Sequence, residues 1–347
     1  MRLLTITRGE PGDAIRELLN TNVIGTPGKS LVYQHLRVDD KLDHIQEPIF
    51  LSVVIGGKPV GTCCLVKRLT WSGGESINSY YIRYFSFKSS FRSSTNILER
   101  PAKQSALKWE IQQVLDGNFL SPSGPHVFYA YVDPSNIRSG RIVHSFGFKE
   151  LGRFRTVFYS RFNPKLYEGI KIIEKSELIL FKQRLKESYI QSSLFTHENI
   201  GFEDGCLAYY HQGRIVAALQ ANPEHWSIFE IPGSKYLIHL ISWVPFLNRL
   251  LNKEFRFLSV EGVFLEEGFE HLLSPLLEGA LKIKNRNTAI LCLDPGSDLY
   301  GRMQNLNRGF ISRLTSEKEM AVVVKGNGFE VNHLRKNPVY VSGFDNM

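Results

Sequence analysis

The stretch HVFYAYVDPSNIRSGRIVHSFGFKELGRFRTVFYSRF, residues 126–162, predicts a strand, a helix and a second strand in direct succession. Apolar residues dominate 126–132, as in a strand, and the Asp-Pro pair that follows would end it. Asn136, or the serine before it, is then a natural N-cap for a helix. Gly147 can close that helix in the left-handed conformation, and the phenylalanine after it can fold back onto the last turn. The next strand is expected over 151–162.

The residues upstream of this stretch predict further strands and a helix. Residues 49–55 and 60–71 flank Gly56-Gly57, and paired glycines favour the two-residue turn of a β-hairpin. Closer to the N-terminus, residues 3–7 are expected to form a first strand. A first helix is expected over 13–20, with Asp13 as its N-cap.

Two of these segments together resemble a known family. The spacing of Asn136, Ser139, Gly147 and Phe148 is similar to the pattern Asn-x-x-Ala/Ser followed by Gly-Phe in the GNAT superfamily of N-acetyltransferases. One strand upstream, residues 84–92 fit the register of a second family segment. In the family this segment is a central strand, and an Arg or Gln after it begins a phosphate-binding loop. The resemblance covers residues 1–165 and implies a mixed α/β sheet that binds acetyl-CoA (coenzyme A).

The resemblance also implies where the cofactor lies. In this family the strand that here carries Phe85, Ser86 and Phe87 runs parallel to the strand that ends at Val132, and the two strands splay apart. Unpaired backbone amides in the gap then bind pantetheine, and the amide near Phe87 would stabilise the oxyanion of the intermediate. Asn136 and, one helical turn on, Ser139 would contact the same cofactor, although capping the helix is the simpler role for Asn136.

The expected phosphate-binding loop departs from the family pattern. Arg-x-x-Gly-x-Gly is replaced by Arg92-Ser93-Ser94-Thr95-Asn96-Ile97, which has no glycine. The hydroxyls of Ser93, Ser94 and Thr95 and the charge of Arg92 can replace the glycine-loop amides, each charge-assisted bond contributing about 1.5–3 kcal/mol. Alternatively, the segment is a surface loop and the cofactor site is loose or lost. Pro101 suits a helix start, so a helix is expected over 101–115.

The expected proton donor is also missing. Many family members carry a tyrosine seven residues after the motif asparagine, and Val143 stands at that position here. His144 and Tyr131 are the candidate catalytic residues that remain, unless water or the substrate handles the proton. The simpler interpretation makes His144 a solvated or packed residue and Tyr131 a strand aromatic.

The composition narrows the function class. The chain has 347 residues, of which 43% are hydrophobic and 22% charged, so a globular protein of two domains is expected. Neither a membrane-spanning run nor a signal peptide is recognisable, which favours a cytoplasmic location. Four scattered cysteines predict buried, reduced thiols and no metal site. The net charge of +8 is diffuse and suits an anionic ligand, so nucleic acid is not favoured.

The second half is expected to repeat the first. Expected elements run in the same order: a helix over 176–188, strands over 206–210, 214–220 and 257–264, a helix over 267–284 and a strand over 289–293. Asp298 then begins a segment that is expected to be a helix closing on Gly309-Phe310. We therefore predict tandem GNAT-like domains, a cofactor-binding one over 1–165 and a degenerate one over 170–347, because Glu266 and Glu267 would repel a pyrophosphate.

These expectations lead to one function and two alternatives. The first is acetyl-CoA-dependent N-acyl transfer to a small-molecule or peptide amine by direct attack on the thioester. The second keeps the fold but takes amino acids from aminoacyl-tRNA, as Fem-type proteins do, which the basic charge and the missing glycines would allow. The third is a GNAT-fold binding protein without catalysis. The acceptor stays open, and a homo-oligomer is compatible with the sequence.

Overall fold

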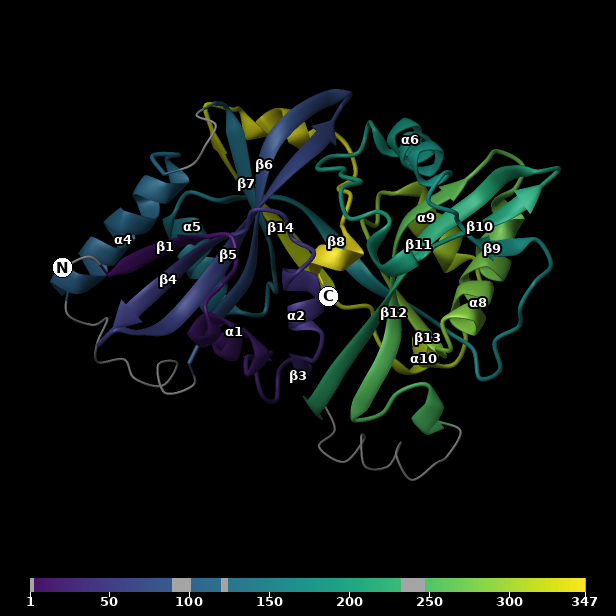
Figure 1. Cartoon of the computed structure of the whole chain (residues 1–347), viewed down its shortest axis with the longest axis horizontal. Coiled ribbons are helices and arrows are strands. Elements are labelled where there is room, and N and C mark those ends of the chain that lie inside the picture. Colours follow the sequence, from purple (N-terminus) through teal and green to yellow (C-terminus); the bar gives the residue numbers. More distant parts are fainter. Residues whose placement is uncertain (1–2, 89–100, 120–123, 232–246, 347) are drawn as a thin grey trace.

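The computed structural model describes residues 3–88, 101–119, 124–231 and 247–346. They form an α/β fold in which helices lie on both faces of one large mixed sheet (Figure 1). The strands are β1 (Leu4–Arg8), β2 (Val23–Ile24), β3 (Val32–His35), β4 (Ile49–Ile55), β5 (Lys58–Ser72), β6 (Glu75–Phe87), β7 (His126–Val132), β8 (Lys149–Ser160), β9 (Ile170–Ile172), β10 (Cys206–His211), β11 (Arg214–Glu230), β12 (Glu254–Leu265), β13 (Thr288–Leu293) and β14 (Glu319–Asn327). The α-helices are α1 (Asp13–Asn20), α2 (Val38–Leu42), α4 (Pro101–Leu115), α5 (Ile137–Ser145), α6 (Leu178–Tyr189), α8 (Leu273–Ile283), α9 (Asp298–Gln304), α10 (Ile311–Leu314) and α11 (Gly343–Asn346).

The sheet has the same construction when it is followed inward from either edge. Its strand order is β1-β4-β5-β6-β7-β14-β8-β13-β12-β11-β10-β9. From β1, three antiparallel pairings lead to β6, which is parallel to β7, and β7 is antiparallel to β14. From β9, three antiparallel pairings lead to β12, which is parallel to β13, and β13 is antiparallel to β8. The predicted repeat of element order is therefore present in the pairing of the strands.

The two halves exchange strands at the centre of the sheet. β14 comes last in the chain, yet it lies between β7 and β8, which belong to the first half. β8 in turn extends past β14 to pair with β13 of the second half. The predicted division at residues 165–170 thus separates the halves in sequence order, while the hydrogen-bonded sheet runs across it. The division into two domains, 1–165 and 170–347, stays a prediction.

Two glycine-containing segments have the local structures that the sequence predicted. Gly56 and Gly57 have φ angles of 58° and 76° and connect β4 to β5 through a two-residue turn between Ile55 and Lys58. Gly147, with φ of 81°, closes α5, where its N–H donates to the carbonyl of His144 and that of Phe148 donates to the carbonyl of Val143. These two bonds form a Schellman motif, which satisfies carbonyls that the helix end leaves free.

Three expectations need correction. Gly12, and not Asp13, is the N-cap residue of α1. α9 ends at Gln304, five residues before Gly309, so Gly309-Phe310 does not close it. The strand expected over 214–220 continues to Glu230, because β12 pairs with it as far as Ser227 and β3 pairs with it from Trp226 to Glu230. Gly309 instead meets β8, where a Cβ atom would lie 2.0 Å from the carbonyl oxygen of Ser160.

Helices cover both faces of the sheet around the parallel pair β6 and β7. On one face, Leu107, Val114 and Leu115 of α4 pack with Tyr80 and Phe128 of the two strands. On the opposite face, α1, α2 and α11 pack against the two strands. The buried residues of this layer include Ile15, Leu19, Val38, Leu42 and Phe344 of the helices and Tyr81 and Tyr129 of the strands. Since successive strand residues point to opposite faces, each strand contributes to both layers.

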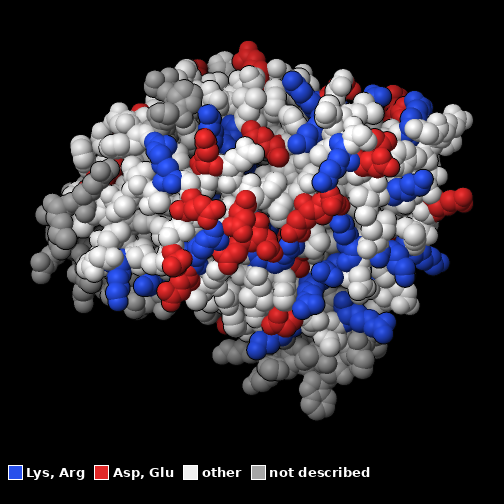
Figure 2. All heavy atoms as spheres, viewed as in Figure 1, with Lys and Arg blue, Asp and Glu red and all other residues white. Residues whose placement is uncertain are grey.

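The surface carries no single dominant charge patch on the face in view. Figure 2 shows acidic side chains gathered near the middle of that face, close to α1 and α2, with lysines and arginines around them. Arg16 of α1 pairs there with Glu10, Asp39 and Asp43. On this face the lysines and arginines therefore form no single basic patch. No helix among the described residues is long and apolar enough to cross a membrane.

Candidate functional site

The parallel strands β6 and β7 separate part of the way along their length. They pair over four residues each, from Asn78 to Tyr81 and from His126 to Tyr129. Beyond that point β6 stays paired with β5 as far as Phe87, and β7 stays paired with β14 as far as Val132. Each strand therefore keeps its outer neighbour while the two inner edges diverge, which is the gap that the sequence predicted.

A β-bulge marks the divergence. Tyr84 has φ of 57°, which is unusual for a residue with a side chain, and the register against β5 shifts between Thr62 and Cys64. A bulge of this kind bends a strand and re-aims its backbone groups. β6 is therefore turned away from β7 where a ligand backbone could enter between them.

The three predicted residues on β6 have different surroundings. Phe85 is half exposed, and its ring lies 5.1 Å from that of Phe87. Phe87 packs over Gly61 of β5, where an added Cβ would come within 2.3 Å of its ring. Ser86 is buried, and its hydroxyl has no hydrogen-bond partner among the described residues. Arg92, Ser93, Ser94 and Thr95 lie outside the described residues.

The N-terminus of α5 follows the diverging end of β7. The side chain of Asn136 accepts a hydrogen bond of 3.1 Å from the backbone N–H of Ser139, so Asn136 is the N-cap residue. Asp133, just before it, is held by Lys318 at 2.7 Å and by Ser135. Burial opposes ionisation of Asp133, yet these hydrogen bonds lower its pKa. The capping role of Asn136 is thus present, and a cofactor contact stays a prediction.

The two candidate catalytic residues lie in different places. Tyr131 belongs to the end of β7 that is no longer paired with β6, and its ring packs 5.1 Å from that of Tyr81 and 5.2 Å from that of Phe154. Burial raises the pKa of Tyr131 well above its usual value. His144 is exposed on α5, whereas Val143 beside it packs into the core. Tyr131 is therefore at the gap, and His144 faces solvent.

Sequence reasoning missed a buried ion-pair cluster below the gap. Asp345 of α11 is 3% exposed and lies 2.9 Å from Arg68 of β5 and 3.6 Å from Arg83 of β6. The hydroxyl of Tyr81 donates to the backbone carbonyl of Asp345 at 3.0 Å. These contacts join the C-terminal helix to the last paired residue of β6. No local signal could have shown this, because Arg68 and Asp345 are 277 residues apart.

The described residues hold no cluster of three or more metal-ligating side chains. Cys64, Cys206 and Cys292 are buried and Cys63 is partly so; all four are free of disulfides. Burial raises the pKa of Cys63, Cys206 and Cys292 to about 12, so these thiols stay protonated at neutral pH. A ligand at the divergence of β6 and β7 would therefore be bound without help from a metal cluster or a thiolate of the described residues.

Comparison with known proteins identifies the fold. No family model and no curated protein matches the sequence. N-myristoyltransferase of Saccharomyces cerevisiae, solved with bound myristoyl-CoA, is 10% identical and aligns over 98% of this chain and 85% of its own, with a TM-score of 0.59. A GCN5-related N-acetyltransferase from Anabaena variabilis is also 10% identical and aligns over 92% of this chain and 72% of its own, with a TM-score of 0.51. Identity this low reports architecture and not activity. The splayed parallel strands and these neighbours together show that the chain has the fold of the GNAT superfamily.

Proposed function

We propose that this protein is an acyl-CoA-dependent N-acyltransferase that binds its donor between β6 and β7 and transfers an acetyl group to an amine. The observation that carries the proposal is the divergence of these strands after Tyr81 and Tyr129, with both outer edges still paired. Backbone groups along the two inner edges need partners, and an extended ligand with amides can supply them as an added strand does.

The donor would be held by backbone and polar groups along the gap. Pantetheine amides would pair with residues 82–87 and 130–132, and an N–H at the bulge would stabilise the oxyanion. The pyrophosphate would lie at the start of α5, where helix N–H groups favour negative charge, and Arg92, Ser93, Ser94 and Thr95 are proposed to bind it as well. Phe85 would pack against the pantetheine part of the cofactor, because its ring is exposed on β6.

The transfer requires two proton movements. The amine nitrogen attacks the thioester carbon, the C–S bond breaks, the amine loses a proton and the thiolate gains one. An alkylamine with a pKa of about 10.4 is neutral in about one molecule in 2,500 at pH 7, so part of the barrier lies in deprotonation. Tyr131 is proposed as the donor to the thiolate, because burial keeps its hydroxyl protonated and its backbone lies at the gap.

The activity test follows acetyl-CoA consumption and N-acetyl product by mass spectrometry with a panel of amines. Product formation is expected, and Tyr131→Phe should lower kcat by about 100-fold, the lower end of general acid–base contributions. Tyr129→Phe is the matched control, because Tyr129 lies on the same strand and face within the paired segment. Its kcat should stay within a few-fold of the wild-type value.

Other results would change the proposed donor or contradict the proposed reaction. Amine-dependent consumption of longer acyl-CoA but not of acetyl-CoA would correct the donor and keep the reaction class. Binding of aminoacyl-tRNA that weakens steeply with salt, with no response to acyl-CoA, would favour the tRNA-dependent alternative. Absence of any melting shift with acetyl-CoA or free CoA would favour a binding protein, since ligand at a hundred times its Kd stabilises by about 2.7 kcal/mol.

A further inference from the structure

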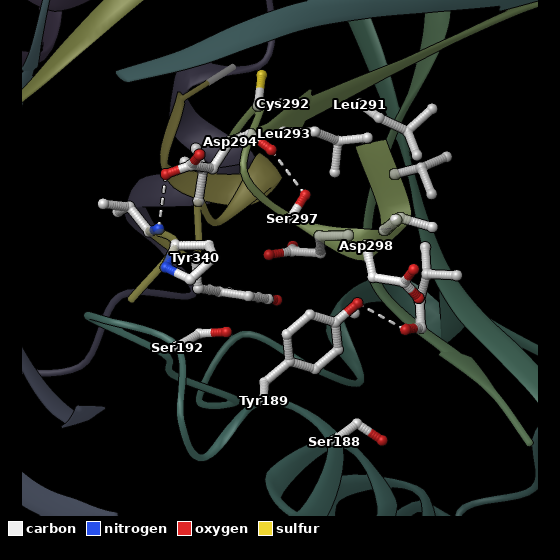
Figure 3. Close-up of a pocket in the computed structure, with 18 of the residues that line it drawn as sticks. Ser188, Tyr189, Ser192, Leu291, Cys292, Leu293, Asp294, Ser297, Asp298 and Tyr340 are labelled. Atoms are coloured by element: carbon white, nitrogen blue, oxygen red, sulfur yellow. Dashed lines mark hydrogen bonds between the residues drawn. The ribbon is translucent and has the colours of Figure 1, made fainter. Parts of the chain in front are cut away.

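The second half contains its own divergence of parallel strands. β12 and β13 pair over three residues each, Leu258–Val260 with Ala289–Leu291, and separate beyond them. Gly262 has φ of 58° at the point where β12 turns away, and the register against β11 shifts nearby. A cavity of about 260 Å³ opens between the separated ends (Figure 3). Tyr189, from the end of α6, and Tyr340, from the C-terminal segment, line it.

Tyr340 lines this cavity with a buried hydroxyl group that has no hydrogen-bond partner among the described residues. The residue is 7% exposed. The backbone N–H of Gly262 lies close enough to lower the pKa of Tyr340 slightly, but burial raises that pKa well above its usual value. An N–H can only donate, so the proton of the hydroxyl still lacks an acceptor. Tyr189 differs, because its hydroxyl donates to the carbonyl of Val263 at 2.7 Å.

The walls of the cavity carry a negative charge excess. Glu261 and Asp294 line it, and neither has an ion-pair partner among the described residues. Burial raises the pKa of Glu261 above its usual value, although the hydrogen bonds that its carboxylate accepts from Ser342 and Phe344 act in the opposite direction. The carboxylate oxygens of both residues accept neutral N–H and O–H groups instead, including the backbone N–H of Gly343 on Glu261 and that of Val339 on Asp294. Asp298 is neutralised by Arg302 at 2.7 Å. Such a cavity disfavours phosphate and carboxylate ligands and favours a cation.

The C-terminal segment connects this cavity with the gap of the first half. Val339 and Val341 line the cavity, and Asp345, four residues after Val341, contacts Arg68 and Arg83 beside the first gap. Both valines also pack in the cluster that holds Tyr81 and Tyr129. A ligand in the cavity therefore lies along the segment that leads to the proposed reaction centre.

We infer that the cavity between β12 and β13 is the acceptor-binding site, and that the acceptor is a cationic amine whose body carries a carbonyl or hydroxyl oxygen for Tyr340. The role as acceptor rests on the proposed function, whereas binding in the cavity does not. Glu261 and Asp294 supply the negative potential that attracts the ammonium form, and the apolar walls at Leu291 and Leu293 take the aliphatic part.

Calorimetric titration with lysinamide, without acyl-CoA, tests the binding directly. Saturable binding is expected for the wild-type chain, and binding at least tenfold weaker is expected for the neutral Nα,Nε-diacetyl derivative. Tyr340→Phe should weaken lysinamide binding roughly two- to tenfold, the range for one hydrogen bond. In a nuclear magnetic resonance titration, lysinamide should shift the amide resonance of Gly262.

The control is Tyr210→Phe, because the hydroxyl of Tyr210 donates to Glu177 and Tyr210 does not line the cavity. Its affinity for lysinamide should equal that of the wild type. No saturable binding below 10 mM, unchanged affinity in a folded Tyr340→Phe, or tighter binding of N-acetylglutamate would each overturn the inference. Because this titration contains no acyl-CoA, a negative result would overturn only the inference about the cavity. The activity test would still decide the proposed function separately.

Discussion

A chain that ends at residue 318 should not unfold cooperatively, because it lacks the strand at the centre of the sheet. β14 is paired along both edges, with β7 from Val132 to His126 and with β8 from Arg155 to Lys149. Its loss leaves the inner edges of both strands unpaired inside the molecule, and each unsatisfied buried backbone group costs about 1–3 kcal/mol. The sum exceeds the 5–15 kcal/mol by which a native domain is usually stable.

Urea unfolding followed by circular dichroism measures this effect. The full chain should show a cooperative transition, and the truncated chain should show none. A synthetic peptide of residues 316–347, added in trans, is the matched control and should restore part of the transition. A truncated chain that unfolds as cooperatively and at the same midpoint as the full chain would show that the first half does not need β14.

Asp345→Asn should lower the free energy of unfolding by about 3–5 kcal/mol, the usual cost of removing one partner from a buried ion pair. The carboxylate of Asp345 faces Arg68 and Arg83, whose side chains are 5% and 4% exposed. Asparagine keeps the shape but removes the buried negative charge beside these two guanidinium groups, and the other carboxylate near Arg68, that of Glu198, is more distant at 3.5 Å. Urea midpoints with a constant slope give the difference.

Asp298→Asn is the control for this substitution. Asp298 also pairs with an arginine, at 2.7 Å, but its side chain is 80% exposed. Exposed pairs of this kind contribute less than about 1 kcal/mol, so the midpoint should barely move. Equal effects of the two substitutions would mean that the cluster around Asp345 is not buried in the folded protein.

The elements that sequence could predict are those whose signals are local. The Gly56-Gly57 turn, the start of α4 at Pro101 and the Gly147-Phe148 closure of α5 each depend on residues within a few positions. Such signals do not depend on the rest of the fold, because turn and cap geometry is set by the φ angles of a few residues.

The elements that sequence could not predict depend on distant partners. β14 is stabilised by β7, which lies almost 200 residues earlier, and the apolar run over 320–324 does not indicate that partner. Gly309 was misread as a helix closure, although its role is to let the chain approach the carbonyl of Ser160. β3 and α2, within 32–42, were not predicted, and β3 is held by pairing with β11 of the other half.

The candidate site was predictable in outline and not in its polar detail. The gap between β6 and β7 follows from the order of strands that the motif around Asn136 indicated. Asp345, Arg68 and Tyr340 could not be recognised, since their meaning depends on where the C-terminal segment lies. Assignment of individual cofactor contacts to Asn136, Ser139 or the Arg92 segment stays a prediction.

Amide hydrogen exchange with and without acetyl-CoA tests the central claim most directly. If the donor enters between β6 and β7, exchange should slow at residues 82–87 and 130–132, while residues 262–265 of β12 and 292–293 of β13 should exchange as before. Slowing confined to β12 and β13, or no change in either half at saturating acetyl-CoA, would contradict the account.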